Sequence, residues 1–182
     1  MNFANKISLF RILSVPFFIA CLYYSSEYHY LRIAALVIFL VAVFSDAIDG
    51  YIARKSKLKS QAGVILDPLA DKALLVSAFI SLYLFKELPF WLILIVVTRD
   101  LLIIFGAVLI YMIKQKLNVA PTKWGKITTT FQMSAIIAVL VKLRISFVFW
   151  WLAAVFTIIS GVDYLMRGFK VLYGTDTAQN SH

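Results

Sequence analysis

The sequence predicts an all-α fold, a polytopic membrane protein built as a bundle of six transmembrane helices, on three observations. The chain has 182 residues, of which 62% are hydrophobic and 15% are charged, whereas a soluble domain is about 45–50% apolar and about 25% charged. The mean hydropathy is +0.88. The apolar residues gather in six long blocks, and one membrane helix needs about 20 such residues. This composition excludes disordered chains, disulfide scaffolds and nearly all soluble enzymes.

Each apolar block is expected to form one span, because short polar stretches separate the blocks. The blocks run over residues 7–24, 31–53, 66–86, 88–113, 125–143 and 146–168. No small-residue cleavage site accompanies the first block, so we expect a retained span rather than a signal peptide. We expect one membrane domain over 1–173, followed by a disordered polar tail over 174–182.

The basic residues predict the orientation of the bundle. Of the 18 Lys and Arg residues, thirteen fall on the side that carries both termini, and four fall on the other side: Arg32, Lys86, Lys142 and Arg144. Because basic loops remain in the cytoplasm, both termini are expected there. The net charge of +9 is expected to face anionic lipid headgroups or an anionic substrate rather than nucleic acid.

Tryptophans mark the opposite interface, where an aromatic belt is expected: Trp91, Trp150 and Trp151.

Four aspartates lie at the adjoining ends of the second and third blocks, where a charge is costly and normally functional. Asp46 and Asp49 are three residues apart, and Asp67 and Asp71 are four apart, so each pair shares a helix face. The two helices are antiparallel and joined by a short loop, which lets the four carboxylates meet. Their repulsion requires a cation, and all-oxygen ligands favour Mg²⁺ or Mn²⁺. Two such ions would suit in-line phosphoryl displacement.

Two alternatives exist for this acidic cluster. In a purely structural role, the carboxylates would pair with Lys55, Lys57 and Lys72. A divalent-cation transporter would also place carboxylates in the membrane, but it would not need an anion donor such as Arg54 beside them.

Small residues accompany the aspartates. Gly50 and Gly63 lie inside apolar blocks, where a glycine costs a helix about 1 kcal/mol relative to alanine. A close ligand would offset that cost, although helix packing is the alternative. Ala53 leaves room one turn beyond Asp49, and Arg54 supplies a planar donor fork suited to phosphate.

Together these residues read Asp46-x2-Asp49-Gly50-x2-Ala53-Arg54-x8-Gly63-x3-Asp67-x3-Asp71. This pattern resembles the signature of the CDP-alcohol phosphatidyltransferase family at all eight positions, and the resemblance covers nearly the whole chain. It implies a membrane-embedded, usually homodimeric enzyme with two divalent ions. Such an enzyme transfers a phosphatidyl or related group from a CDP-linked donor to an alcohol and releases CMP.

The resemblance also implies a role for each matching residue. Asp46, Asp49 and Asp67 would be metal ligands, and Asp71 would complete the metal site and act as general base on the acceptor hydroxyl. The residues implied for the CDP pocket are Gly50, Ala53, Arg54 and Gly63.

The N-terminal run Asn5-x2-Ser8-x2-Arg11 resembles a family element, Asn-x2-Thr-x2-Arg, that helps to hold the CDP moiety. Serine stands here in place of threonine. The alternative interpretation is a helix cap followed by a snorkelling cation.

Arg99, Lys126 and Thr122 are the candidate acceptor-binding residues. A mid-span arginine should face the bundle interior or a cavity, and we expect Arg99 to bind the phosphate of the acceptor. Pairing with Asp163 is the alternative, and pairing with Asp100 is not expected, because adjacent helix residues diverge. Lys126 near a helix start is placed for an anion, or else is a surface cation.

Two acceptors remain open. The run Ser160-Gly161-Val162-Asp163-Tyr164 resembles family members that use sn-glycerol 3-phosphate. The pair Arg99-Asp100, with Ala107 where those members carry a second arginine, instead resembles the CMP-forming members that make cardiolipin from phosphatidylglycerol. We expect CDP-diacylglycerol as donor and glycerol 3-phosphate as acceptor, in a bacterial inner membrane with the site on the cytoplasmic side.

Overall fold

The computed structural model describes residues 3–56, 61–114 and 123–173, with side chains described for 10–45, 72–106, 108, 112 and 123–169. Across these ranges the chain forms six helices and no strand, which confirms the all-α prediction. The helices are α1 (Phe3–Tyr24), α2 (His29–Ser56), α3 (Gln61–Leu84), α4 (Phe90–Lys114), α5 (Lys123–Leu140) and α6 (Ser146–Tyr173).

The helices differ from the predicted blocks mainly at their ends. Several extend into polar flanks, because a helix does not stop where hydrophobicity does. In contrast, α3 and α5 end two or three residues early, because Lys86 and Lys142 adopt left-handed backbone conformations with φ of 59° and 55°. After α3, the Glu87 N–H donates to the Leu82 carbonyl at 2.9 Å, which closes a Schellman motif.

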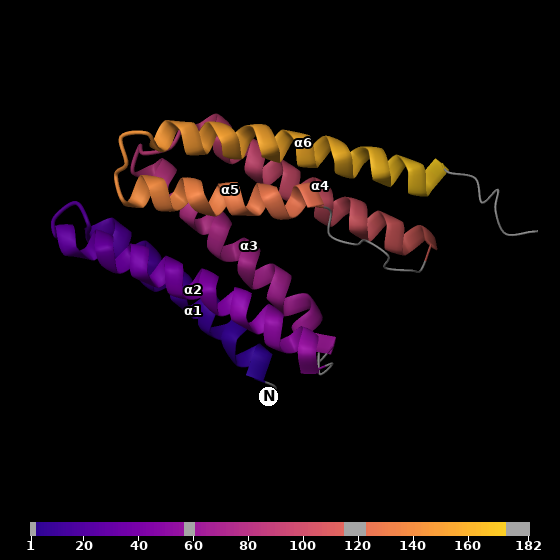
Figure 1. Cartoon of the computed structure of the whole chain (residues 1–182), viewed down its shortest axis with the longest axis horizontal. Helices are drawn as coiled ribbons and strands as arrows, with labels where there is room; N and C mark the ends of the chain where they lie inside the picture. Colours follow the sequence, from indigo (N-terminus) through magenta and orange to yellow (C-terminus); the bar gives the residue numbers. More distant parts are fainter. Residues whose placement is uncertain (1–2, 57–60, 115–122, 174–182) are drawn as a thin grey trace, which may run out of the picture.

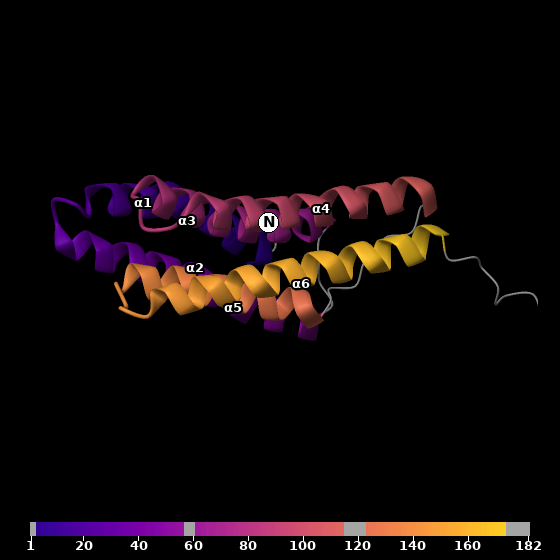
Figure 2. The ribbon, with the colours of Figure 1, turned by 90° about the horizontal axis from the view of Figure 1, so that it is seen from above.

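The bundle consists of two groups of three helices. α1 packs against α2 and α3, and α6 packs against α4 and α5, with smaller contacts between the groups. The turns after α1, α3 and α5 lie at one end of the molecule (Figure 1). The two groups diverge away from these turns, so the start of α1 and the end of α6 lie far apart. Figure 2 shows α1, α3 and α4 along one side and α2, α5 and α6 along the other.

The core lies toward the end with the short turns. Its largest buried side chains are aromatic and aliphatic, and they come from α1, α2, α3, α4 and α5: Phe18, Phe39, Phe79, Leu92 and Ile136. Three tryptophans cluster where α4 and α6 begin, with ring centroids 4.9 Å apart for Trp91 and Trp151 and 5.8 Å apart for Trp91 and Trp150.

One arginine fastens the two helix groups together at this end. Arg32 on α2 donates from Nη1 and Nη2 to the two carboxylate oxygens of Glu87, at 2.6 and 2.7 Å. Its Nε and Nη2 also donate to the carbonyls of Leu140 and Val139, both at 2.7 Å. The guanidinium therefore satisfies terminal carbonyls of α5 while it binds the turn between α3 and α4.

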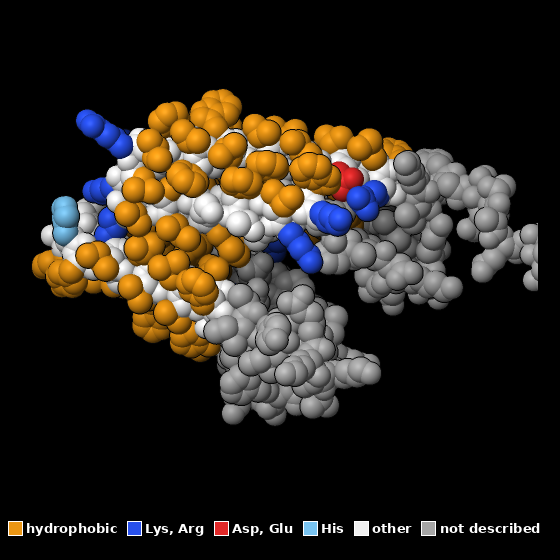
Figure 3. Space-filling model, in the orientation of Figure 1, with side chains coloured by type: hydrophobic (Ala, Val, Ile, Leu, Met, Phe, Trp, Pro, Cys, Tyr) orange, Lys and Arg blue, Asp and Glu red, His pale blue; other side chains and the backbone are white. Residues whose placement is uncertain are grey.

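Large hydrophobic side chains cover much of the outer surface (Figure 3). Phe17 and Ile33 are each 65% exposed, and Val155 is 47% exposed. An apolar surface of this extent marks contact with a membrane or a partner.

Within the part of the chain that the structure describes, Ser146–Phe169 is the one helix long and apolar enough to cross a membrane. Shorter apolar stretches run over Phe10–Tyr24, His29–Ser45 and Lys72–Leu84. Six spans therefore remain a prediction.

Glu87→Gln should lower the free energy of unfolding by about 1–3 kcal/mol, because Arg32 loses a charge-assisted partner that is mostly buried. The measurement is the thermal unfolding midpoint in detergent. Glu27→Gln is the matched control, since Glu27 is an exposed glutamate in the turn after α1 at the same end of the bundle. Equal midpoints for the two variants would contradict a stabilising role of the Arg32–Glu87 contact.

Candidate functional site

The backbone places the two aspartate pairs on neighbouring helices. Asp46 and Asp49 lie in the C-terminal half of α2, and Asp67 and Asp71 lie in the N-terminal half of α3. Both halves adjoin residues 57–60 in the sequence and lie away from the turns after α1, α3 and α5 (Figure 1). The meeting of the four carboxylates remains a prediction.

The side chains of most predicted site residues lie outside the described residues. These are Asn5 and Ser8 on α1, Asp46, Asp49, Gly50, Ala53 and Arg54 on α2, Gly63, Asp67 and Asp71 on α3, and Thr122 between α4 and α5. Among the side chains that are described, no three of the His, Cys, Asp and Glu residues gather as a metal site would require. The predicted metal ligands and general base therefore remain predictions.

The described part of the site centres on a buried polar network that joins α3, α4 and α6. The Oδ1 atom of Asp100 accepts from Lys72 Nζ and from Arg99 Nη1, each at 2.8 Å. Arg99 Nη2 donates to Ser160 Oγ at 2.7 Å. The side chains of Arg99 and Asp100 are each 7% exposed, and that of Lys72 is 28% exposed.

The ion pair between Arg99 and Asp100 corrects the expectation that adjacent helix residues do not pair. Their Cβ atoms do diverge, but the long arginine side chain folds back so that its Nη1 reaches the neighbouring carboxylate. A buried cation and a buried carboxylate in apolar surroundings gain strongly from such pairing. The alternative, pairing of Arg99 with Asp163, is also wrong, because Asp163 binds Arg167 one turn along α6, at 3.0 Å.

The network carries an excess of positive charge. Lys72 and Arg99 supply two positive charges, and Asp100 supplies one negative charge. Among the described residues, Arg99 Nε and Asp100 Oδ2 are buried and have no hydrogen-bond partner. An unpartnered buried polar atom costs free energy, so a group that accepts from the Nε–H of Arg99 would remove part of that cost.

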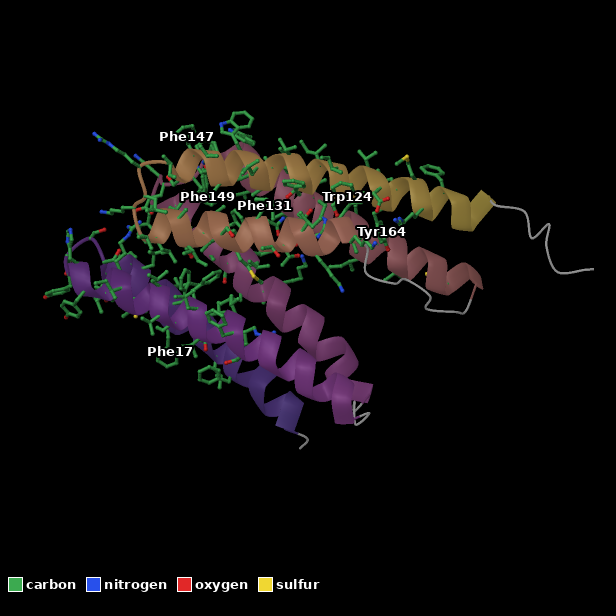
Figure 4. The ribbon with its side chains drawn as sticks, viewed as in Figure 1. Phe17, Trp124, Phe131, Phe147, Phe149 and Tyr164 are labelled. Carbon is green, nitrogen blue, oxygen red and sulfur yellow. The ribbon has the colours of Figure 1, made fainter. Side chains whose placement is uncertain are left out.

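Close packing between α4 and α6 holds the network in place. The Tyr164 hydroxyl donates to the Ile103 carbonyl at 3.1 Å, and Figure 4 shows Tyr164 on α6 where α4 passes beside it. A Cβ atom at Gly106 would lie 2.9 Å from the Tyr164 ring, so a larger residue there would force the ring to move. A Cβ atom at Gly161 would lie 3.7 Å from Cγ of Arg99, which places the arginine stem directly against α6.

Aromatic stacking fixes α5 against α6 beside this region. The rings of Phe131 and Phe156 are stacked with centroids 4.5 Å apart, and Trp124 stacks on the same Phe156 ring at 6.4 Å. Figure 4 labels Trp124 and Phe131 on α5. The Thr128 hydroxyl adds a hydrogen bond to the Phe156 carbonyl at 2.8 Å.

Two further predicted site residues are described and differ in burial. Arg11 on α1 is only 2% exposed, which fits a cation that faces the protein rather than lipid. Lys126, in the first turn of α5, is exposed, and its exposure is compatible with both a surface cation and a donor to an anion.

The sequence alone predicts no site role for Lys72, Asp100 or Ser160. It offers Lys72 only as a structural partner of the aspartate cluster, and Ser160 only as part of a run that resembles other family members. All three are polar residues inside an apolar block, and this feature could have identified them. Their contacts depend on how different helices pack together, and the residue spacing within one helix does not determine that packing.

Comparisons with known proteins identify the chain's family. The CDP-alcohol phosphatidyltransferase family model matches residues 1–159. A CDP-diacylglycerol–glycerol-3-phosphate 3-phosphatidyltransferase of Aquifex aeolicus is 35% identical over 186 aligned residues, which cover 95% of this chain and 99% of the relative. The protein of the same name from Bacillus subtilis is 32% identical over 189 residues, with coverages of 94% and 97%.

A third relative is named for a different product. The cardiolipin synthase (CMP-forming) / mitochondrial hydrolase fusion protein of Schizosaccharomyces pombe is 44% identical over 100 residues, which cover 55% of this chain and 16% of the fusion. The family match spans most of the chain and includes every position of the aspartate motif. This chain therefore belongs to the CDP-alcohol phosphatidyltransferase family.

Proposed function

We propose that this protein transfers a phosphatidyl group from CDP-diacylglycerol to sn-glycerol 3-phosphate, giving phosphatidylglycerophosphate and CMP. The observation that carries this proposal is the alignment, over nearly the whole of both chains, with two relatives named for that reaction. Cardiolipin synthesis is less well supported, because the relative named for it aligns over 55% of this chain.

In the proposed reaction, the acceptor hydroxyl oxygen forms a bond to the phosphorus of the phosphatidyl group. The bond from that phosphorus to the bridging pyrophosphate oxygen breaks, and CMP leaves with the electron pair. Asp71 takes the hydroxyl proton, because an alcohol is a poor nucleophile until a base removes its proton. The donor lipid stays in the bilayer, which requires a site at the membrane–cytoplasm boundary.

Two Mg²⁺ or Mn²⁺ ions are proposed as cofactors, held by Asp46, Asp49, Asp67 and Asp71. The donor set fits them, because it is entirely carboxylate oxygen and hard divalent cations prefer oxygen. The two pairs also lie in the halves of α2 and α3 that adjoin residues 57–60. When bound, the ions would neutralise charge that develops on the pyrophosphate.

The nucleotide part of the donor is proposed to lie against α1, α2 and α3. The residues proposed to contact it are Asn5, Ser8, Arg11, Gly50, Ala53, Arg54 and Gly63. The burial of Arg11 supports this placement, because a cation that contacts the nucleotide must face the bundle interior rather than lipid.

The acceptor phosphate is proposed to bind Arg99, assisted by Lys126 and Thr122. The support is the excess positive charge around Asp100 and the buried, unpartnered Nε of Arg99 among the described residues. Nε can donate to a phosphate oxygen without breaking the two bonds that the Nη atoms already make.

We also propose six membrane spans in a bacterial inner membrane, with both termini and the site on the cytoplasmic side, and a homodimer as the assembly. The basic residues concentrated on the predicted cytoplasmic side support the orientation. The exposed apolar surface supports the membrane location.

The reaction is tested by CMP release from the purified chain in detergent with CDP-diacylglycerol and Mg²⁺. Glycerol 3-phosphate and phosphatidylglycerol are supplied in separate reactions. Release with glycerol 3-phosphate alone is expected. Release with phosphatidylglycerol alone would assign cardiolipin synthesis instead, and Mg²⁺ flux in proteoliposomes without CMP release would identify a transporter.

Asp71→Asn should reduce CMP release by at least about 100-fold, the lower end of what a positioned general base contributes. The thermal unfolding midpoint of the variant should stay close to that of the unaltered chain. Asp163→Asn is the control, since that carboxylate binds the exposed Arg167, and its activity should be retained. Full activity of Asp71→Asn would exclude Asp71 as the base.

Arg99→Ala should raise the KM for glycerol 3-phosphate by about tenfold or more, because a charge-assisted contact contributes about 1.5–3 kcal/mol. The KM for CDP-diacylglycerol should change less than twofold. Arg167→Ala removes an exposed arginine on α6 and should change neither constant. Equal increases in both KM values for Arg99→Ala would remove Arg99 from the acceptor pocket.

A further inference from the structure

We propose that Asp100 is a positioning residue for the transfer reaction, which holds Arg99 and Lys72 in fixed positions beside the acceptor. This inference rests on the proposed function and deepens it. Asp100 itself contacts no substrate and acts through the two cations that it binds.

A single carboxylate oxygen of Asp100 binds both cations. Oδ1 of Asp100 accepts from Lys72 on α3 and from Arg99 on α4, both at 2.8 Å. Two cations drawn to the same oxygen would repel each other if the carboxylate were neutral. Replacing Asp100 by a neutral residue should therefore displace both cations, even though each would keep its own charge.

A contribution to folding stability does not by itself explain why Asp100 is buried. Removal of two charges from water costs more than their attraction returns unless the remaining polar atoms are satisfied. Here, among the described residues, Oδ2 of Asp100 and Nε of Arg99 are buried and have no partner. A network left incomplete in this way contributes little to stability, whereas its Nε–H on Arg99 is a donor that an acceptor phosphate would satisfy.

Lys72 and Arg99 lie next to the groups proposed to react and to bind the acceptor. Lys72 directly follows Asp71, the proposed base, and Arg99 is the proposed ligand of the acceptor phosphate. A carboxylate that binds both therefore links the part of α3 that removes the proton to the part of α4 that binds the acceptor. A displacement of about 1 Å between reacting groups can cost up to about 100-fold in rate.

Ser160 provides a second support for the same guanidinium. Its hydroxyl accepts from Arg99 Nη2 at 2.7 Å, and Ser160 is only 1% exposed. With Nη1 bound to Asp100 and Nη2 bound to Ser160, the plane of the guanidinium is fixed. The direction in which its Nε–H points is then fixed as well.

The experiment measures CMP release by the full chain in detergent while glycerol 3-phosphate and CDP-diacylglycerol are varied in turn. For Asp100→Asn we expect kcat/KM for glycerol 3-phosphate to fall about tenfold or more. The KM for CDP-diacylglycerol should stay within about twofold. Asp100→Glu restores the negative charge and should be about fivefold or more faster than Asp100→Asn.

Glu87→Gln is the matched control, because it also neutralises a carboxylate bound to an arginine, but in the turn between α3 and α4 rather than within α4. It should lower the unfolding midpoint and leave both KM values unchanged. Ser160→Ala gives an independent test if Asp100→Asn does not fold, and should raise the KM for glycerol 3-phosphate about threefold, as loss of one hydrogen bond predicts.

The failures are distinguishable. If the unaltered chain releases no CMP with glycerol 3-phosphate, the proposed function is refuted and the inference with it. If the unaltered chain is active and Asp100→Asn matches it, the inference alone is refuted. Equal losses in Asp100→Asn and Asp100→Glu, with both KM values raised together and a lower unfolding midpoint, would also refute it by assigning Asp100 a purely structural role.

Discussion

Burial of charge inside an apolar bundle is the constraint that organises this protein. A lysine, an arginine and a carboxylate meet between α3 and α4, and the arginine continues to a serine on α6. In surroundings of low polarity, such groups must find partners on other helices, because little water reaches them. These contacts add directional constraints on α3, α4 and α6 to the hydrophobic packing of the bundle, which is less directional.

Two charged clusters in the bundle use similar chemistry with different outcomes. At the end with the short turns, Arg32 donates to two carboxylate oxygens and two carbonyls, and these hydrogen bonds join α2 to the turn after α3 and to the end of α5. Within α4, the network around Asp100 keeps buried polar atoms without partners among the described residues. The first cluster therefore stabilises the bundle, whereas the second retains an Nε–H of Arg99 that the proposed acceptor phosphate would satisfy.

The departures from the glycerol 3-phosphate members of the family acquire a physical interpretation from this network. Asp100 follows Arg99 directly, and its short side chain reaches both Lys72 and Arg99 at 2.8 Å. Lys72 thus brings a second cation to the carboxylate that binds Arg99, in a chain that has alanine at position 107 where those members carry an arginine. Near-complete alignment with relatives named for that acceptor is consistent with these substitutions.

The sequence by itself was sufficient for the helical class, the approximate limits of all six helices and the family. Hydrophobicity and residue spacing are properties of the chain alone, and the motif from Asp46 to Asp71 has fixed spacing along it. The early ends of α3 and α5 were not predictable, because Lys86 and Lys142 adopt a left-handed conformation that lysine rarely prefers.

Tertiary structure alone decided which polar residues meet. Spacing along α4 argued against an Arg99–Asp100 pair, and it offered Asp163 as a partner for Arg99. In the folded chain Arg99 instead binds both Asp100 and Ser160, while Asp163 binds Arg167. The physical reason is that a long side chain selects its partner by distance and local polarity in three dimensions, and both are set only when helices from distant parts of the chain pack together.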